Sequence, residues 1–427
     1  MDGNKEFQFD YGKGKMSFEL PAKNFLMEVK ANDINPRLTG LDEVMRALDN
    51  PIGTPRLSDI VSKGESVCII TSDVTRPCPS QILLPPIIDE LQEAGILPDD
   101  ITVVFGLGSH RRHTEEEKRN LVGENVYELV HTVDSDPDDT VFLGSTSRGT
   151  PVNITSIVAQ ADRRICLGNI EMHYFAGYSG GGKAIMPGVS DRAAIQANHS
   201  MMIEKTSRAG EIAHNNVRLD IEEAADICGI DFILNVVLDE EKTIVKAVAG
   251  DHRAAHRAGC EFLDTMYKIR LPELADIVIA TPGGFPKDIN IYQAQKSLDN
   301  AQHAVKDNGV IILAGDCSEG FGEHVFEEWL TEAPTPESLI KRIQTEFRLG
   351  GHKAAAIAMV LQKCDVYFVS ALSSDIAAKT FMKPYPDIQS AIDDAMRKTG
   401  KNAKIIVMPH AGSTLPCFDP NTNIDET

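Results

Sequence analysis

Three groups of polar side chains each follow directly on an apolar, strand-like run of this 427-residue chain. They are Asp73-Val74-Thr75-Arg76 after residues 66–71, His110-Arg111-Arg112-His113 after residues 101–108, and His173 after residues 164–170. The carboxyl ends of parallel strands lie along one edge of an open α/β sheet, so side chains beyond three such strands can share one crevice. Because histidine exchanges protons near neutral pH, these groups predict a site for acid–base chemistry.

A glycine-rich segment, Gly177-Tyr178-Ser179-Gly180-Gly181-Gly182-Lys183, lies just beyond the third group. Its glycines and lysine have the spacing of a phosphate-cradling nucleotide loop, but Ala184 stands where a hydroxyl would bind magnesium, which argues against a nucleotide triphosphatase. Such a run lets the backbone approach a flat or charged ligand closely. The Lys183 amine can anchor a carbonyl-like carbon covalently or clamp a charge, and the alternative is a surface lysine after a turn.

Four histidines lie near these motifs: His110, His113, His173 and His199. His110 and His113 lack the acidic residue of the helical zinc-protease pattern, and His199 has no obvious second ligand nearby. We therefore expect no zinc site made by protein alone, although a metal held partly by a cofactor needs fewer protein ligands. Five other histidines are expected to face solvent or cap helices: His131, His214, His252, His256 and His303.

Length and charge limit the classes of protein that the chain can be. A chain of 427 residues exceeds what one hydrophobic core supports, so two domains are expected. The formal charge of −21 opposes nonspecific attraction to nucleic acid or anionic membrane. Eight scattered cysteines are expected to be reduced thiols, and no signal peptide or membrane span is seen, so we expect a cytoplasmic protein.

Alternating strand and helix patterns predict the fold class, two α/β domains with mainly parallel sheets and a cleft between them. Residues 7–20 alternate around a glycine turn and predict an N-terminal β-hairpin. We expect an N-terminal α/β domain over residues 1–270 that carries the histidines and the lysine, and a C-terminal α/β domain over 271–427 that contributes substrate contacts, its tail returning to the first domain. Two strands are expected to end at residues 71 and 170, and further strands are expected over residues 101–106, 141–143, 275–280, 309–314, 365–370 and 403–408. Helices are expected over residues 41–48, 81–94, 115–122, 154–159, 292–306 and 336–344.

Several motifs together resemble one known family. They are Asp73-Val74-Thr75-Arg76-Pro77, Gly106-Leu107-Gly108-Ser109-His110-Arg111, the segment from His173 to Lys183, Pro187-Gly188-Val189, His199, and Tyr292-Gln293-Ala294-Gln295-Lys296. In this order they are similar to the nickel-dependent lactate racemase family of 2-hydroxyacid racemases and epimerases. The likeness covers most of the chain and is more specific than any single motif.

The resemblance implies a cofactor, the nickel-pincer nucleotide, a pyridinium-3-thioamide-5-thiocarboxylic acid mononucleotide nickel complex. By this resemblance Lys183 tethers the nucleotide through a thioamide and His199 completes the coordination of Ni, to which an imidazole ligand is chemically suited. Thr75, Gly180, Gly181 and Gly182 are expected to contact the cofactor. Maturation enzymes that build the nickel compound are implied as partners, beside a small 2-hydroxy acid as substrate.

The family's chemistry is hydride transfer, which avoids a carbanion beside the substrate carboxylate. By the resemblance, His110 and His173 act as alternating general base and acid, one for each enantiomer, and Asp73 and Arg76 orient them. Gln293 and Lys296 lie three apart on one helical face and are expected to bind the substrate carboxylate.

One departure from the family's pattern concerns the substrate. Lactate-acting members place a tryptophan of the second domain beside the substrate, but the only tryptophan of this chain is Trp329. The comparable stretch is Gly350-Gly351-His352-Lys353, in which His352 is expected to contact substrate. Its polar side chains favour a 2-hydroxy acid larger or more polar than lactate.

Three other functions stay open on the sequence. A nicotinamide-dependent 2-hydroxyacid dehydrogenase would share the α/β build, but no well-placed dinucleotide fingerprint follows an early strand. A pyridoxal-phosphate racemase would form a Schiff base at Lys183 and act on an amino acid. A noncatalytic cofactor-binding protein would keep the pocket and tolerate loss of His110 and His173.

Overall fold

The computed structural model describes residues 3–419, and the chain divides into two compact units. One unit spans Ile34–Thr265, and the other joins the residues up to Asp33 to those from Met266 onward. The division near residue 265 lies a few positions before the predicted boundary. The grouping of the first 33 residues with the C-terminal part differs from the predicted domain of residues 1–270.

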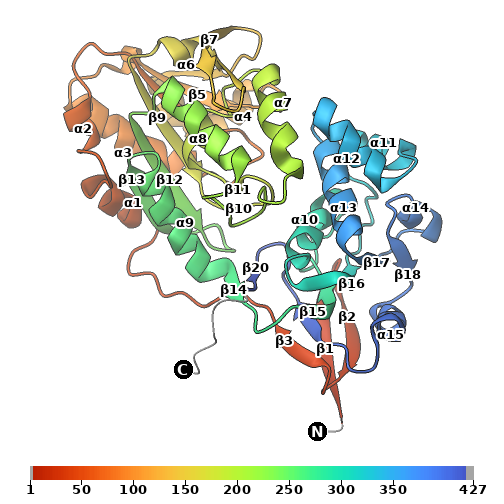
Figure 1. The fold of residues 1–427 in the computed structure, drawn as a ribbon. Helices are drawn as coiled ribbons and strands as arrows, with labels where there is room; N and C mark the ends of the chain where they lie inside the picture. Colours follow the sequence, from red (N-terminus) through yellow and green to blue (C-terminus); the bar gives the residue numbers. More distant parts are fainter. Residues whose placement is uncertain (1–2, 420–427) are drawn as a thin grey trace. The chain divides into compact units, whose positions relative to one another are not determined.

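A six-stranded sheet forms the centre of the unit Ile34–Thr265 (Figure 1). Its strands are β4 (Val67–Ser72), β5 (Ile101–Gly106), β6 (His131–Asp134), β9 (Arg163–Asn169), β12 (Phe232–Leu238) and β13 (Ile244–Gly250). They lie in the order β13-β12-β9-β4-β5-β6, with every neighbouring pair parallel except β12 and β13. The strands that precede the three polar groups, β9, β4 and β5, are therefore adjacent and end at the same edge.

Helices and short strands complete this unit. The helices are α1 (Gly40–Asp49), α2 (Leu57–Ile60), α3 (Ser80–Glu93), α4 (Glu115–Val122), α5 (Glu124–Leu129), α6 (Ser156–Gln160), α7 (Arg192–Ser200), α8 (Asn216–Cys228) and α9 (Ala254–Tyr267), with 3-10 turns η1 (Pro98–Asp100), η2 (Gly181–Ala184) and η3 (Met201–Ile203). Two small antiparallel sheets pair β7 (Thr140–Ser145) with β8 (Pro151–Thr155) and β10 (Met172–His173) with β11 (Gly177–Tyr178). The predicted strand near residue 141 thus lies outside the main sheet, because the short turn after Ser145 returns the chain antiparallel to itself.

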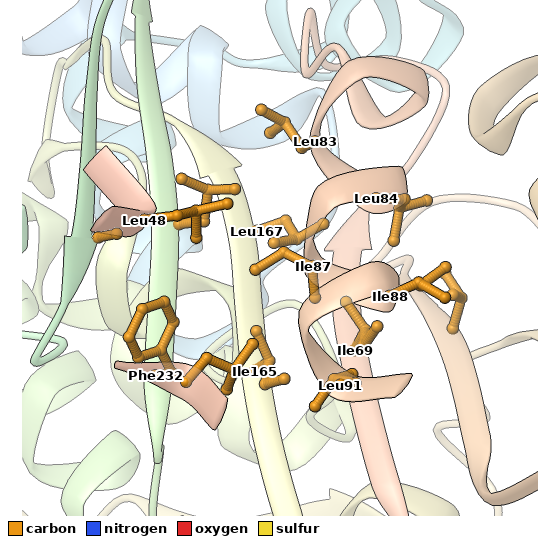
Figure 2. Packing of buried hydrophobic residues seen from close by; sticks show 14 of the residues in the cluster. Leu48, Ile69, Leu83, Leu84, Ile87, Ile88, Leu91, Ile165, Leu167 and Phe232 are labelled. Carbon is orange, nitrogen blue, oxygen red and sulfur yellow. The ribbon is translucent and has the colours of Figure 1, made fainter. Parts of the chain in front are cut away.

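The main sheet is held in place by a continuous apolar core. Leu48 of α1, Ile87 of α3, Ile69 of β4 and Phe232 of β12 are all fully buried in one cluster (Figure 2). Burial of each such side chain contributes about 1.5–3 kcal/mol. This packing fixes the ends of the strands, and with them the start of every loop that carries a polar group.

The second unit contains a six-stranded sheet that is parallel throughout. Its strands lie in the order β18 (Lys383–Tyr385), β17 (Asp365–Val369), β16 (Val305–Ala314), β15 (Ala275–Ala280), β19 (Ile405–Met408) and β3 (Phe25–Glu28). Its helices are α10 (Ile291–Ala301), α11 (His324–Glu332), α12 (Pro336–Thr345), α13 (Gly351–Lys363), α14 (Ser374–Ala378) and α15 (Ile388–Thr399). The helix predicted over residues 292–306 ends at Ala301 because β16 begins at Val305.

The predicted N-terminal hairpin is confirmed as β1 (Asn4–Tyr11) and β2 (Gly14–Pro21), which pair antiparallel. Its buried face carries Phe7, Phe9, Phe18 and Leu20, which belong to the same core as the sheet of the second unit. Strand β3 then joins that sheet beside β19. This apolar face explains why the first 33 residues belong with the C-terminal part of the chain.

The last described residues also belong to the second unit. Strand β20 (Leu415–Cys417) pairs with β14 (Lys268–Arg270). The predicted return of the tail to the first domain falls partly on residues 420–427, which lie outside the described residues. Over residues 3–419, no helix has both the length and the apolar character needed to cross a bilayer.

Candidate active site

The loop after β4 and the loop after β5 meet in a hydrogen-bonded group of Asp73, Thr75 and His110. Asp73 Oδ2 pairs with His110 Nδ1, and Asp73 Oδ1 accepts a 2.9 Å hydrogen bond from the Thr75 hydroxyl. Burial raises the pKa of Asp73, but the hydrogen bond from His110 and the charge of Arg76 outweigh it, so this pKa lies below its usual value. An ionised Asp73 accepts the Nδ1 proton of His110, which leaves Nε2 of the ring as the nitrogen that can take a proton.

The third loop carries His173 on the small β10–β11 hairpin. The backbone N–H of Ala176 donates to His173 Nδ1 at 3.2 Å, so a neutral His173 ring has its proton on Nε2. Burial, followed by the charge of Lys183, lowers the pKa of His173 well below its ordinary value. The two rings therefore differ at Nε2: His110 has its lone pair there, whereas neutral His173 carries its proton there.

Lys183 lies beside His173, at the end of the glycine-rich segment. Its Nζ is 3.5 Å from His173 Nε2 and 5.9 Å from the centre of the Phe175 ring. Burial lowers the pKa of Lys183 well below its usual range, and the charges of Arg218 and Arg76 lower it further. A neutral buried amine is a nucleophile, which is the form that a covalent anchor requires.

The charge of Arg76 acts on both pairs of the site, Asp73 with His110 and His173 with Lys183. The guanidinium charge acts on Asp73 in the first pair and lowers the pKa of both His173 and Lys183 in the second. Asp73, Arg76, His110, His173 and Lys183 are thus brought together at one edge of the sheet, as the strand pattern predicted.

His199 lies on α7, the helix that Asp191 caps by accepting from the Ala194 amide, and it packs against the Phe175 ring that Lys183 also contacts. The His199 and Phe175 rings are 5.0 Å apart, and His199 Nδ1 is 3.0 Å from Asn198 Oδ1. When Asn198 accepts the Nδ1 proton, the lone pair on Nε2 is the one a metal would use, and such an outer hydrogen bond is typical of histidine ligands. Over residues 3–419 no group of three or more ligand side chains is placed to hold a metal.

The predicted cofactor contacts at Gly180, Gly181 and Gly182 have a second explanation in the packing of the protein itself. A Cβ on Gly180 would lie 2.7 Å from Asn235 Oδ1, and one on Gly182 would lie 2.9 Å from the Ala225 Cβ. These glycines let the lysine loop lie directly against β12 and α8. Their contact with a cofactor stays a prediction.

Buried polar side chains that the sequence analysis did not single out hold this loop. Arg218 donates to the carbonyls of Ala176 and Tyr178, and Asn235 accepts from the Gly181 amide at 2.7 Å. His256 Nε2 lies 2.8 Å from the Ser179 carbonyl. An asparagine inside the apolar run of β12 is the sequence signal that could have revealed Asn235.

The expectation that His252 and His256 face solvent or cap helices is wrong. Both are buried, and His252 Nε2 lies 2.9 Å from Asp226 Oδ1. Isolated histidines carry no periodic pattern, so their burial depends on which elements pack over them. His256 is buried because α9 packs it against the glycine-rich loop.

The predicted substrate contacts Gln293, Lys296 and His352 lie in the second unit. Gln293 and Lys296 share the exposed face of α10, which Asn290 caps by accepting from the Gln293 amide at 3.0 Å. His352 is 8% exposed, and its Nδ1 accepts from the Gly350 amide at 3.1 Å.

Lys353 is also buried, which corrects the interpretation of this stretch as a polar lining for substrate. Its Nζ donates to the Tyr292 carbonyl at 2.6 Å and lies 3.8 Å from the centre of the Tyr292 ring. Burial raises the pKa of Asp299 to about 7, and the charge of Lys353 acts in the opposite direction. Lys353 therefore joins α13 to α10, a role that the sequence pattern did not reveal.

Comparisons with known proteins match most of the chain to the same kind of protein. A family model described as lactate racemase N-terminal domain matches residues 11–210, and one described as lactate racemase C-terminal domain matches residues 272–415. A lactate racemase from Thermoanaerobacterium thermosaccharolyticum is 34% identical over 420 residues, which cover 96% of this chain and 98% of that protein. A lactate racemase from Lactiplantibacillus plantarum is 33% identical over 412 residues, or 93% of this chain and 96% of that one.

Solved structures agree in fold. The lactate racemase apoprotein from Thermoanaerobacterium thermosaccharolyticum matches with a TM-score of 0.86 and 33% identity, covering 96% of this chain and 100% of that one. A Thermotoga maritima protein matches with a TM-score of 0.62 over 90% of this chain and 100% of that one, and at 16% identity it shows the fold alone.

Proposed function

Because this chain belongs to the lactate racemase family, we propose that it interconverts the two enantiomers of a 2-hydroxy acid by removing the C2 hydrogen as hydride and returning it to the opposite face. Membership of the family makes the protein an isomerase. Loss of hydride avoids the carbanion that direct deprotonation beside a carboxylate would form. The proposal concerns the route of the reaction, the residues that carry it and the choice of substrate.

The observation that carries this proposal is the part-buried amine of Lys183 beside the part-buried imidazole of His173, 3.5 Å apart, both with a lowered pKa. Neither side chain has a carboxylate partner within hydrogen-bonding distance among the interactions of the described residues. Placing two basic groups next to each other away from water costs stability, and such groups with perturbed pKa values are typical of functional sites. A neutral amine that condenses with a carboxyl-derived carbon gives this cluster a chemical purpose.

The residues present fit a nickel-pincer nucleotide. Lys183 would form the thioamide tether and His199 would provide an imidazole nitrogen to nickel. Thr75 and the glycines at 180–182 would lie along the nucleotide. When bound, this group supplies the acceptor for the substrate hydride.

His110 and His173 move the proton of the substrate hydroxyl in this proposal. Each accepts or returns that proton, one histidine for each enantiomer. His110 can accept it at Nε2 directly, whereas His173 can accept it at Nε2 only after its ring changes to the tautomer that breaks the Ala176 contact. Asp73 holds His110 in the tautomer whose Nε2 can accept a proton, and the Ala176 amide fixes the His173 ring. The exposed guanidinium of Arg76 offers a charge to an oxyanion of the substrate.

We propose a substrate larger or more polar than lactate, with Gln293 and Lys296 binding its carboxylate. The support is the single tryptophan of the chain, Trp329, which is fully buried in α11. His352 and Lys353 are buried, so the polar side chains of residues 350–353 do not carry this proposal. A panel of lactate, malate, phenyllactate and sugar acids tests this point, and efficient turnover of lactate alone would contradict it.

Isotope retention tests the hydride route. Substrate deuterated at C2 should react more slowly and keep its label in the product, whereas loss of label to water would show proton abstraction instead. Intact-protein mass spectrometry of material made with and without the maturation enzymes should show an adduct at Lys183 together with nickel by elemental analysis. An unmodified Lys183 in active enzyme would refute the tether.

The same preparations separate the other functions. A dehydrogenase would require added nicotinamide cofactor, and an aldimine of pyridoxal phosphate would absorb visible light. A noncatalytic binding protein would show no difference between the wild type and the His110→Ala or His173→Ala variants. We propose a cytoplasmic location on the cysteines, none of which forms a disulfide within the described residues.

A further inference from the structure

His113 is the histidine of the motifs that the proposed mechanism does not use. It follows His110 by three positions on the loop after β5, and its side chain is only 1% exposed. Its ring packs edge-on against Phe105, with the ring centres 5.2 Å apart. A histidine buried so fully needs partners for both ring nitrogens.

Both partners are present: one lies at the end of β6, and the other lies in the loop after β4. His113 Nδ1 lies 2.6 Å from Asp134 Oδ1 at the end of β6, and Asp134 Oδ2 accepts the His113 backbone N–H at 2.9 Å. On the other side, His113 Nε2 accepts the backbone N–H of Val74 at 3.0 Å. Val74 is the residue directly after Asp73 in the loop that follows β4.

These contacts allow only one form of the ring. The Val74 amide is a donor, so Nε2 must carry the lone pair, and Nδ1 must carry the proton that Asp134 accepts. The Asp134 carboxylate thereby selects the tautomer in which His113 can hold the Val74 amide. That amide belongs to the peptide group joining Val74 to Asp73, whose carboxylate holds His110.

We propose that His113 and Asp134 are positioning residues that set the orientation of the Asp73 carboxylate toward His110 through the Val74 amide. This inference rests on the proposed function for its catalytic consequence, but the arrangement of the loop stands on the contacts alone. The pair acts on the reaction only through Asp73, since neither side chain is assigned a substrate contact.

Two substitutions of His113 each keep one of its side-chain hydrogen bonds and remove the other. In His113→Gln, the side-chain oxygen can replace Nε2 and accept from Val74. In His113→Asn, the shorter amide can reach Asp134 but not Val74. We expect His113→Gln to keep kcat within about threefold of the wild type and His113→Asn to lower it by about 10- to 100-fold with little change in KM, because small misplacements of catalytic groups are costly.

Asp134→Asn provides a second variant that removes no bulk. The amide N–H₂ that this substitution introduces would face His113 Nδ1 and favour the other tautomer, which places a proton against the Val74 amide. We expect a loss of kcat similar to that of His113→Asn. His131→Asn, a change at the exposed start of the same strand, is the matched control and should leave kcat unchanged.

A proton NMR measurement on protein without cofactor makes the test independent of turnover. The downfield N–H resonance of the His110–Asp73 pair, assigned by its loss in His110→Gln, should persist in His113→Gln and shift or vanish in His113→Asn and Asp134→Asn. An unchanged resonance in the last two variants would overturn the proposal, as would equal kcat for the Gln and Asn variants at position 113. If the wild type shows no turnover while the resonance responds as described, the proposed function fails and the positioning role stands.

Discussion

Gly180→Ala is the substitution whose effect the structure allows us to work out most fully. Gly180 precedes the lysine loop with φ of +75° and ψ of −174°, a region that is essentially restricted to glycine and costs an alanine about 1–3 kcal/mol. The new Cβ would also lie 2.7 Å from Asn235 Oδ1 and 2.9 Å from Ile170 Cγ1. Since overpacking costs about 1–3 kcal/mol and loss of the Asn235 to Gly181 hydrogen bond costs about 1 kcal/mol, we expect a total loss of about 3–7 kcal/mol once the backbone cost is included.

Gly149→Ala is the matched control for the backbone effect. Gly149 lies in the same unit with φ of +84°, and a Cβ there would meet nothing within 4 Å. It should lose only the cost of a positive φ, about 1–3 kcal/mol. A larger loss for Gly180→Ala than for Gly149→Ala therefore reports the close packing of the lysine loop against β12.

Thermal unfolding followed by circular dichroism measures both variants. For a unit of this size, 1 kcal/mol lowers Tm by about 2–4 °C, so Gly180→Ala should lie clearly below Gly149→Ala. Trp329 is the single tryptophan and lies in the other unit, so its fluorescence reports separately on residues that neither variant touches. Equal Tm values for the two variants would refute the argument that protein packing, beside any ligand, requires glycine at position 180.

Three further predictions concern the site. In protein without cofactor, the stability of the wild type should rise with pH more steeply than that of Lys183→Met, up to about pH 10.4. The reason is that Lys183 binds a proton in the unfolded chain but not in the folded protein, where its pKa is lowered. Parallel pH profiles of Tm for the two proteins would contradict this. Asp73→Asn should lower kcat by about 100-fold by releasing the His110 tautomer, and a wild-type rate would exclude that role. His199→Ala should lose nickel, measured by elemental analysis of purified protein, while the circular dichroism spectrum is kept; unchanged nickel content would remove His199 as a ligand.

The strand pattern predicted the convergence of Asp73, His110 and His173 correctly, because parallel strands covered on both faces leave long apolar runs in the sequence. Helix α4 was predicted at its observed bounds, since Thr114 and Glu117 form a capping box at its start. The pairing of β7 with β8 outside the main sheet was missed, because a short strand looks the same whichever partner it takes.

The sequence by itself determined the fold class, the order of the strands along the chain and the residue types at the ends of β4, β5 and β9. Only the tertiary structure decided that the N-terminal hairpin packs with the C-terminal sheet, that Lys353 is an internal contact, and that Arg218 and Asn235 hold the lysine loop. The physical reason is that backbone propensity and apolar periodicity are local properties of the chain. The partner of a buried polar group lies far away in sequence, and nothing in the neighbouring residues identifies it.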